Sequence, residues 1–527
     1  MVNPAEWFHR KKKEVKRTVA GSLTSQTKQQ QNIPSGIDEC MEQLSQTFGS
    51  TVDLATSKIM FGNQPALLVF LTSLTDSKLI AEKIITPLAF SKEIPEYEQN
   101  LETYCKTMLR GIEYKLSQKW QDVIQLLLSG YAALFVESSG NALALKIQGS
   151  TYRSIDEPTT QTIVKGPKDG FTESAETNIS LIRRRILNPA LRFESYTLGT
   201  ETRTPVYLAY IEGIINPGIL QETRTRLNNM QTNAIFDTGI IEEFITDKTL
   251  TPFPLIFNTE RPDSTAANLI TGKVAIIAEG SPFVLILPTT FSDFFQVSED
   301  YYQPYMMASF IRLVRYVAFM ISLLLPATYV SVITYHHELL PTQLLISIMA
   351  QREGIPFPTV VEALLMELTF EILREAGIRM PRAVGMTVSI VGGLVIGQAA
   401  VEAGIISNIM VIIVALTAIS SFVSPVYAFS MSSRLLRFTM IVLGAFLGLY
   451  GVILGLMIMV GHLCSLRSFG IPYLSPLAPW ILGDQNDVFI RAPMWAMKKR
   501  PFYLHTQDLI KQPRAESPSP PPDGSPS

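Results

Sequence analysis

The chain has 527 residues, a formal net charge of −2 and a mean hydropathy of +0.22, so its length allows two or three domains. A charge this close to zero gives no sign of the basic surface that nucleic-acid binding needs, and we expect no nucleic-acid partner. The three cysteines, Cys40, Cys105 and Cys464, lack any metal-ligand or paired spacing, which excludes a disulfide framework and favours a reducing compartment.

The first 150 residues are expected to form a disordered arm and a first soluble subdomain. The arm, residues 1–35, is basic and then rich in Gln, Ser and Thr. It has no apolar core of the kind found in secretory signal peptides. Within the subdomain, residues 36–150, the pattern predicts helices at 37–48 and 120–128, a buried strand at 66–74, and a hairpin of strands 131–137 and 142–147.

Residues 151–300 are expected to form a linker and a second soluble subdomain. Helices are predicted at 177–187 and 218–229, and strands at 192–198 and 205–212. A second hairpin is predicted, with strands 274–278 and 283–287. This alternation of helices and strands indicates α/β or α+β units in both subdomains.

Residues 301–466 are expected to form an α-helical transmembrane bundle, which makes the fold class mixed: a soluble α/β (α+β) region followed by membrane helices. Four uncharged stretches approach or exceed the roughly 20 residues that cross a bilayer. A shorter piece, 339–351, is expected to be re-entrant or half of a broken helix. If the chain crosses the membrane four times, the segments before and after the bundle lie on the same side of it. A fifth crossing would place them on opposite sides. The spans are 316–335, 383–401, 403–427 and 438–466, and the tail 467–527 is expected to be disordered from about residue 510.

Glycines recur at helical spacing in two of these stretches. Gly444, Gly448, Gly451 and Gly455 would share one face of the last span, and Gly393 and Gly397 form a second small-residue pair. Such faces let helix backbones approach closely, so we expect helix packing there. The alternative is that apolar helices are simply rich in glycine.

One acidic amphipathic helix, 358–377, is expected to carry the mechanism. Glu367, Glu371 and Glu375 share a face beside Arg374, whereas Glu362 lies on the opposite, apolar face near Met366. In a ring of identical subunits Glu362 would line an acidic collar that selects cations. The alternative is that Glu362 caps or pairs with a nearby arginine while the helix lies on the membrane surface.

No pattern in the chain indicates an enzyme or a bound cofactor. His336, His337 and Glu338 lack a third ligand at helical spacing, so a solvated cluster at the membrane surface is the simpler interpretation. Residues 271–273 resemble the end of a phosphate-binding loop, but Ala267 stands where that loop needs glycine. We therefore expect neither catalytic nor metal-binding residues.

Many short motifs, in order, resemble the A-subunit family of bacterial spore germinant receptors, the GerA family. The resemblance covers roughly residues 36–505, and no single motif is specific by itself. The motifs are GPKDGFTE at 166–173, NISLIRRR at 178–185, TERPD at 259–263, EGSPF at 279–283, EDYY at 299–302, PFP at 356–358, EALLME at 362–367, FEILREAGIRMP at 370–381, IVGGLVIGQAAV at 390–401 and RLLRF at 434–438.

The resemblance implies a multi-pass protein of the inner spore membrane that acts with a permease-like B subunit and a lipoprotein C subunit. A subunits of this family are thought to oligomerise into an ion channel that opens on nutrient sensing. We therefore expect a nutrient-gated channel with Glu362, Met366, Glu367, Glu371 and Arg374 as pore or gating residues. Residues expected to couple the soluble part to the bundle are Pro167, Arg184, Asp300, Tyr301 and Tyr302. A secondary transporter, a non-conducting scaffold, or the A-like paralogue associated with dipicolinate release are the alternatives.

Overall fold

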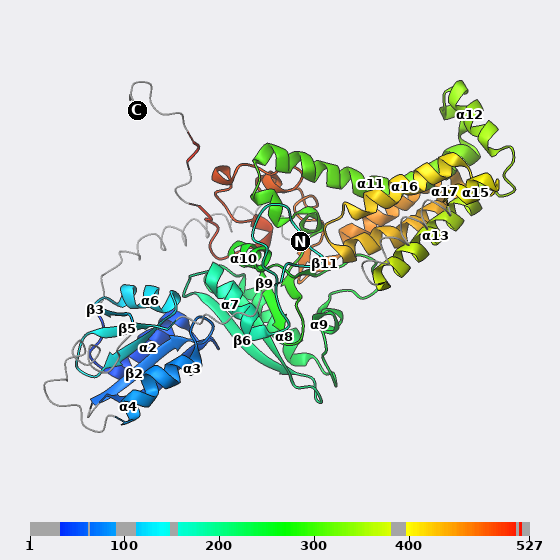
Figure 1. The fold of residues 1–527 in the computed structure, drawn as a ribbon. Helices are drawn as coiled ribbons and strands as arrows, with labels where there is room; N and C mark the ends of the chain where they lie inside the picture. Colours follow the sequence, from blue (N-terminus) through cyan, green and yellow to red (C-terminus); the bar gives the residue numbers. More distant parts are fainter. Residues whose placement is uncertain are drawn as a thin grey trace, which may run out of the picture. The chain divides into compact units, whose positions relative to one another are not determined.

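The computed structural model describes residues 32–61, 64–90, 112–147, 156–380, 397–512 and 516–518 (Figure 1). The chain divides into two compact units. The first contains residues 1–151, and the second contains a further sheet domain together with the helical region. Gly393 and most of the expected span 383–401 lie outside the described residues, as do the arm up to residue 31 and residues 519–527 of the tail.

The first unit is a five-stranded antiparallel sheet in the order β1-β2-β4-β5-β3, covered by helices on both faces. The inner strand β2 is buried along most of its length, because alternate residues face two separate cores. Helices α2 (Ile37–Phe48) and α6 (Trp120–Leu128) cover one face, and α3 (Ser77–Ile80) and α4 (Thr86–Phe90) follow β2 on the chain. The strands are β1 (Leu54–Phe61), β2 (Gln64–Leu71), β3 (Tyr114–Ser117), β4 (Tyr131–Val136) and β5 (Ala142–Lys146).

The sheet domain of the second unit repeats this topology, with strand order β6-β7-β9-β10-β8. Helices α7 (Ala175–Arg185) and α10 (Pro262–Thr271) pack on one face, and α8 (Pro217–Asn229) and α9 (Thr238–Ile245) on the other. The strands are β6 (Leu191–Leu198), β7 (Thr204–Ile211), β8 (Phe257–Thr259), β9 (Val274–Ala278) and β10 (Val284–Leu287). Each sheet domain is thus one hairpin, one edge strand and a second hairpin, separated by helices.

Four longer helices lie side by side in the helical region: α11 (Tyr305–Tyr335), α13 (Thr359–Arg379), α16 (Asn408–Phe422) and α17 (Tyr427–Ser465) (Figure 1). Two of them, α11 and α17, are long and apolar enough to cross a membrane. Shorter helices, α12 (Thr342–Arg352) and α15 (Gly397–Glu402), complete the region. The expected span 403–427 is not one continuous helix, because α16 has 15 residues and ends before Ser424 and Pro425.

The expected single span 438–466 is a helical hairpin. Helix α17 begins at Tyr427 and reverses at Gly448, whose φ of 62° and ψ of −149° are not helical. A Cβ placed on Gly455 would lie 2.7 Å from the sulfur of Met440, although in one straight helix these residues would be about 22 Å apart. The four glycines therefore do not share a face of one helix. Gly448 forms the turn, while Gly444, Gly451 and Gly455 lie where the two arms meet.

An aromatic junction joins this bundle to the sheet domain. Phe429 of α17 stacks on Phe294 with ring centroids 5.1 Å apart and on Phe319 of α11 at 5.0 Å. Phe295 stacks on Tyr316 of α11 at 4.0 Å. One hydrophobic core therefore runs from α7 and α10 through residues 291–295 into the helices. After α17, the chain returns through β11 (Arg467–Ser468) and β12 (Ile471–Pro472) and packs on the sheet domain as far as residue 512.

Replacement of Gly448 by alanine should destabilise the hairpin. Its backbone conformation is one that residues with a Cβ rarely adopt, which costs about 1–3 kcal/mol. The added Cβ would also lie 2.7 Å from His336 Cε1. We expect a lower thermal midpoint in detergent for G448A. In the control G461A, on the second arm of α17, the Cβ enters open space and alanine favours the helix. Equal midpoints for both variants would contradict the hairpin turn.

Glu242 on α9 should make the stability depend on pH. Burial, and secondarily the nearby Asp237, raise the pKa of Glu242 from 4.5 to about 7. The folded chain therefore binds a proton that the unfolded chain releases, and the free energy of unfolding should fall as pH rises from about 4.5 to about 7. We expect E242Q to melt higher than the wild type at pH 8 and equally near pH 4.5. E243Q, which changes an exposed neighbour, should follow the wild type at every pH; parallel curves for E242Q would disprove the assignment.

Candidate functional site

Helix α13 buries Glu362 and Glu367 in the bundle and exposes Leu368 and Ile372. The two carboxylates are 1% and 0% exposed, whereas Leu368 and Ile372 are 56% and 60% exposed. Glu362 and Glu367 are five residues apart, and so about 140° apart around the helix, and both are buried because they face different neighbours. An amphipathic helix in water would show the reverse arrangement. Met366 is partly buried and packs against the main core.

Glu362 clamps the start of α16. Its Oε1 accepts hydrogen bonds from the Ser407 backbone N–H, at 2.6 Å, and from the Ser407 hydroxyl. Its Oε2 pairs with Arg352 Nη1 at 3.3 Å. Within one chain these are the contacts of the capping and pairing alternative. The role of Glu362 in ion conduction stays a prediction.

Glu367 forms a fully buried ion pair with Arg437 of α17. Arg437 Nη1 lies 2.5 Å from Glu367 Oε2, and its Nε donates to the Ser322 carbonyl of α11 at 2.7 Å. One pair thus ties three helices together. The other carboxylate oxygen, Oε1, is buried and has no hydrogen-bond partner among the described residues. Arg437 is ten residues into α17, so the pair lies about halfway up its first arm.

Glu371 continues the charged row, which we name the α13 seam: Glu362, Glu367 and Glu371 with the arginines that face them. Glu371 pairs with Arg434 at 3.0 Å and with Arg374 at 3.4 Å. Arg374 also donates to the Ser421 hydroxyl at 2.8 Å and lies 4.7 Å over the Phe422 ring. Glu375, by contrast, is exposed and pairs with Arg379.

The α13 seam is not a purely acidic surface within one chain. Its three carboxylates face four guanidinium groups, those of Arg352, Arg374, Arg434 and Arg437. The helix pattern identified the acids and Arg374, but not the other three arginines. Arg434 and Arg437 lie between the expected spans 403–427 and 438–466, and in the sequence only the RLLRF motif at 434–438 singles them out.

The expected coupling residues gather around the start of α11. Asp300 is 2% exposed and pairs with Arg312 at 3.0 Å and Arg315 at 2.8 Å. Arg312 also pairs with Asp487, which lies beyond the end of α17, and Tyr301 donates to the same carboxylate at 2.7 Å. The start of the first long helix and the chain after the last one therefore meet in a single charged cluster.

Pro167 and Tyr302 meet through one arginine of the sheet domain. Arg261 donates to the Pro167 carbonyl at 2.8 Å and pairs with Asp263 at 2.9 Å. The Tyr302 hydroxyl donates to Asp263 at 2.7 Å. Arg184 is exposed, while its neighbour Arg183 is buried with its guanidinium 5.1 Å from the Phe193 ring. The structure thus links the 166–170 loop to the base of α11.

Removal of one charge from the buried pair should be costly. E367Q leaves the Arg437 guanidinium unpaired inside the bundle, for which we expect a loss of about 3–5 kcal/mol. E375Q is the control on the same helix, because its exposed pair with Arg379 should contribute at most about 1 kcal/mol. Thermal or denaturant unfolding in detergent measures both. A loss for E367Q no larger than that for E375Q would show that the pair does not hold the bundle.

The comparisons with known proteins agree on one family. The model of the Bacillus/Clostridium GerA spore germination protein family matches residues 42–503. Spore germination protein KA of Bacillus subtilis is 47% identical over 90% of this chain and 87% of its own length. The uncharacterized membrane protein YfkQ of the same organism is 41% identical over 92% of this chain and 95% of its own.

One solved structure is also similar, at 29% identity and a TM-score of 0.40. It is the N-terminal domain of the A subunit of the Bacillus megaterium spore germinant receptor GerK3, and the match covers 50% of this chain and 99% of that one. The family model spans most of the chain and the curated relatives cover nearly all of it. The chain is therefore a member of the GerA family of spore germination proteins.

Proposed function

We propose that this chain is the A subunit of a spore germinant receptor and that its helical region forms, or contributes to, a nutrient-gated ion channel in the inner spore membrane. Membership of the GerA family supports the receptor role. The observation that carries the channel role is the α13 seam, a row of ionised side chains enclosed by helices whose outer surface is apolar.

The membrane placement rests on the orientation of α13 and its neighbours. Leu368 and Ile372 of α13 are exposed on the outside of the bundle, whereas Glu362, Glu367 and Arg437 are buried inside it. Apolar tails of lipid are the surroundings that make this arrangement favourable. Helix α11 has 31 residues, and the two arms of α17, 427–447 and 449–465, have 21 and 17 residues, which lies within the range of lengths that cross a bilayer. We therefore propose a multi-pass integral protein.

The channel proposal follows from what charged groups do inside a membrane. Ionisable side chains that face a bundle interior usually mark an ion pathway or a water-filled cavity. The paired carboxylates of Glu362, Glu367 and Glu371 correspond to a closed arrangement. In the open state some of these pairs separate, and the freed carboxylates line a cation path between several copies of the chain.

Nutrient binding has to supply the energy of that opening. A ligand shifts such an equilibrium only by the difference in its affinity for the two states. We propose that the nutrient binds a permease-like B subunit, that a lipoprotein C subunit completes the receptor, and that the Asp300 cluster passes the change from the soluble domains to α11. The Asp300 cluster comprises Asp300, Arg312, Arg315 and Asp487.

A secondary transporter is the second candidate, and the helix breaks favour it. Helix α16 has only 15 residues and α17 reverses at Gly448, and transporters use such interrupted helices at their binding sites. A non-conducting scaffold, or a paralogue that serves dipicolinate release, are further possibilities within this family. The relative YfkQ is described only as a membrane protein.

The decisive experiment is electrical recording from the full chain reconstituted with its co-purified partner subunits. We expect single-channel cation currents from the wild type, and altered selectivity or open probability in E362Q, because Arg352 loses its negative partner. E375Q, an exposed acid on the same helix, should behave as the wild type. Saturable flux without channel currents would make the chain a carrier, and neither signal would make it a scaffold. Unchanged currents in E362Q would remove Glu362 from the site.

A further inference from the structure

A cavity of about 560 Å³ lies between α8, the loop after α9 and the chain that leaves α17. All of its lining belongs to the second unit, so its walls come from one compact body. A volume of this size is typical of small-molecule sites. Neither the α13 seam nor the Asp300 cluster contributes to it.

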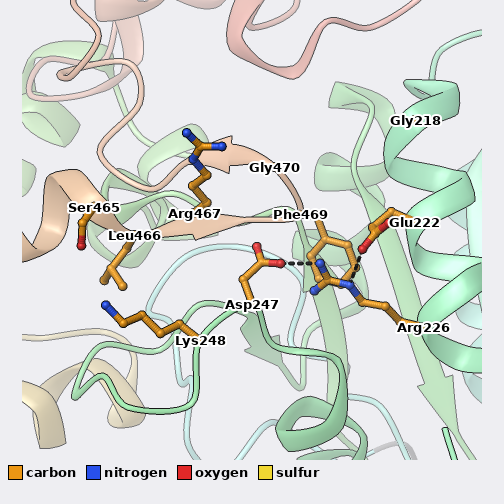
Figure 2. A pocket seen from close by; sticks show the side chains of 10 residues that line it. All are labelled: Gly218, Glu222, Arg226, Asp247, Lys248, Ser465, Leu466, Arg467, Phe469 and Gly470. Carbon is orange, nitrogen blue, oxygen red and sulfur yellow. Dashed lines mark hydrogen bonds and ion pairs between the residues drawn. The ribbon is translucent and has the colours of Figure 1, made fainter. Parts of the chain in front are cut away.

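Arg226 forms one wall of the cavity, and its guanidinium group is bonded to neighbouring groups of the protein (Figure 2). Its Nε donates to Glu222 at 2.8 Å, and the guanidinium also bonds Asp247 and the Ile245 carbonyl. It lies 4.3 Å over the ring of Phe469. Arg226 therefore pairs with both acids of the cavity, and its one positive charge offsets one of their two negative charges.

Two further cations, Lys248 and Arg467, line the same cavity and are exposed. In the part of the chain that the structure describes, neither side chain has a hydrogen bond or ion pair. Figure 2 shows both outside the group formed by Arg226, Asp247 and Glu222. The cavity lining therefore holds three cations, Arg226, Lys248 and Arg467, against two acids, which leaves one positive charge in excess.

Helix ends modify this charge only slightly. Ser465 closes α17 and brings about half a negative charge, while Gly218 in the first turn of α8 brings a similar positive charge. These partial charges offset each other. The lining keeps its one excess positive charge, with Lys248 and Arg467 as the cations outside the Arg226 group, so the ligand that the cavity favours is an anion.

We propose that this cavity binds a phosphate ester, with Lys248 and Arg467 as its binding residues. The ammonium group of a lysine attracts a phosphate as a compact charge. The guanidinium group of an arginine can also donate two parallel hydrogen bonds to it. Two sources carry this chemistry: the headgroup of an anionic phospholipid and a soluble phosphate compound. The lipid source rests on the proposed membrane placement, since the cavity opens beside the end of α17, where a bilayer surface would lie. The phosphate chemistry does not depend on that placement.

Binding to the purified full chain in a neutral detergent tests the proposal, with short-chain phosphatidylglycerol and glycerol phosphate as the two probes. Each cation near such a site contributes about fivefold in affinity, so K248A/R467A should bind about 25-fold more weakly than the wild type. K58A/K83A removes two exposed lysines of the first unit and should bind as the wild type. The charge-preserving K248R/R467K should retain most of the affinity.

The two probes separate the sources. Binding of the lipid alone supports a headgroup site, and binding of both probes supports a site for soluble phosphate esters. Binding of neither, or equal binding by the wild type and K248A/R467A at equal thermal midpoints, would overturn the proposal. A chain that stays soluble without detergent yet still binds glycerol phosphate would refute the membrane placement while the phosphate site stands.

Discussion

The arrangement of the second unit depends on one buried carboxylate, Asp300. Two arginines of α11 bind it, and one of them reaches across to Asp487 beyond α17. Burial of a charge costs several kcal/mol unless partners compensate it, so the group is stable only as a complete set. The aromatic junction packs directly beside it. The sheet domain and the helices are therefore joined by the Asp300 cluster and by one hydrophobic core, so neither can move without changing its contacts with the other.

The α13 seam is a second set of buried charges that compensate one another, here inside the bundle. Arg437 joins Glu367 to the Ser322 carbonyl, so one guanidinium holds helices from three parts of the chain. Such a group is stable when every partner is in place and unstable when one is removed. Bundles held in this way have discrete arrangements rather than a continuous range, which is what a gate requires.

Much of the sheet domains could be predicted from the sequence, because their signals are local. The hairpin over 131–147 has two continuous apolar runs around a Ser-Gly turn, and helix 37–48 agrees with α2 to the residue. The helical region was predicted less well. A hydropathy profile does not reveal the reversal at Gly448, since the two arms of α17 are both apolar. A helical wheel of α13 places Glu362 and Glu367 around the helix axis but does not show that both are buried, and the Glu367–Arg437 pair joins residues 70 positions apart.

The reversal at Gly448 also decides at which end the chain leaves the bundle. Because the two arms of α17 run antiparallel, Ser465 lies at the same end of the bundle as Tyr427. The chain that follows Leu466 therefore returns to the sheet domain of the second unit, on which it packs as far as residue 512. One straight helix over the same 39 residues would release the chain at the opposite end of the bundle. The return of this segment to the sheet domain thus depends on one residue without a side chain.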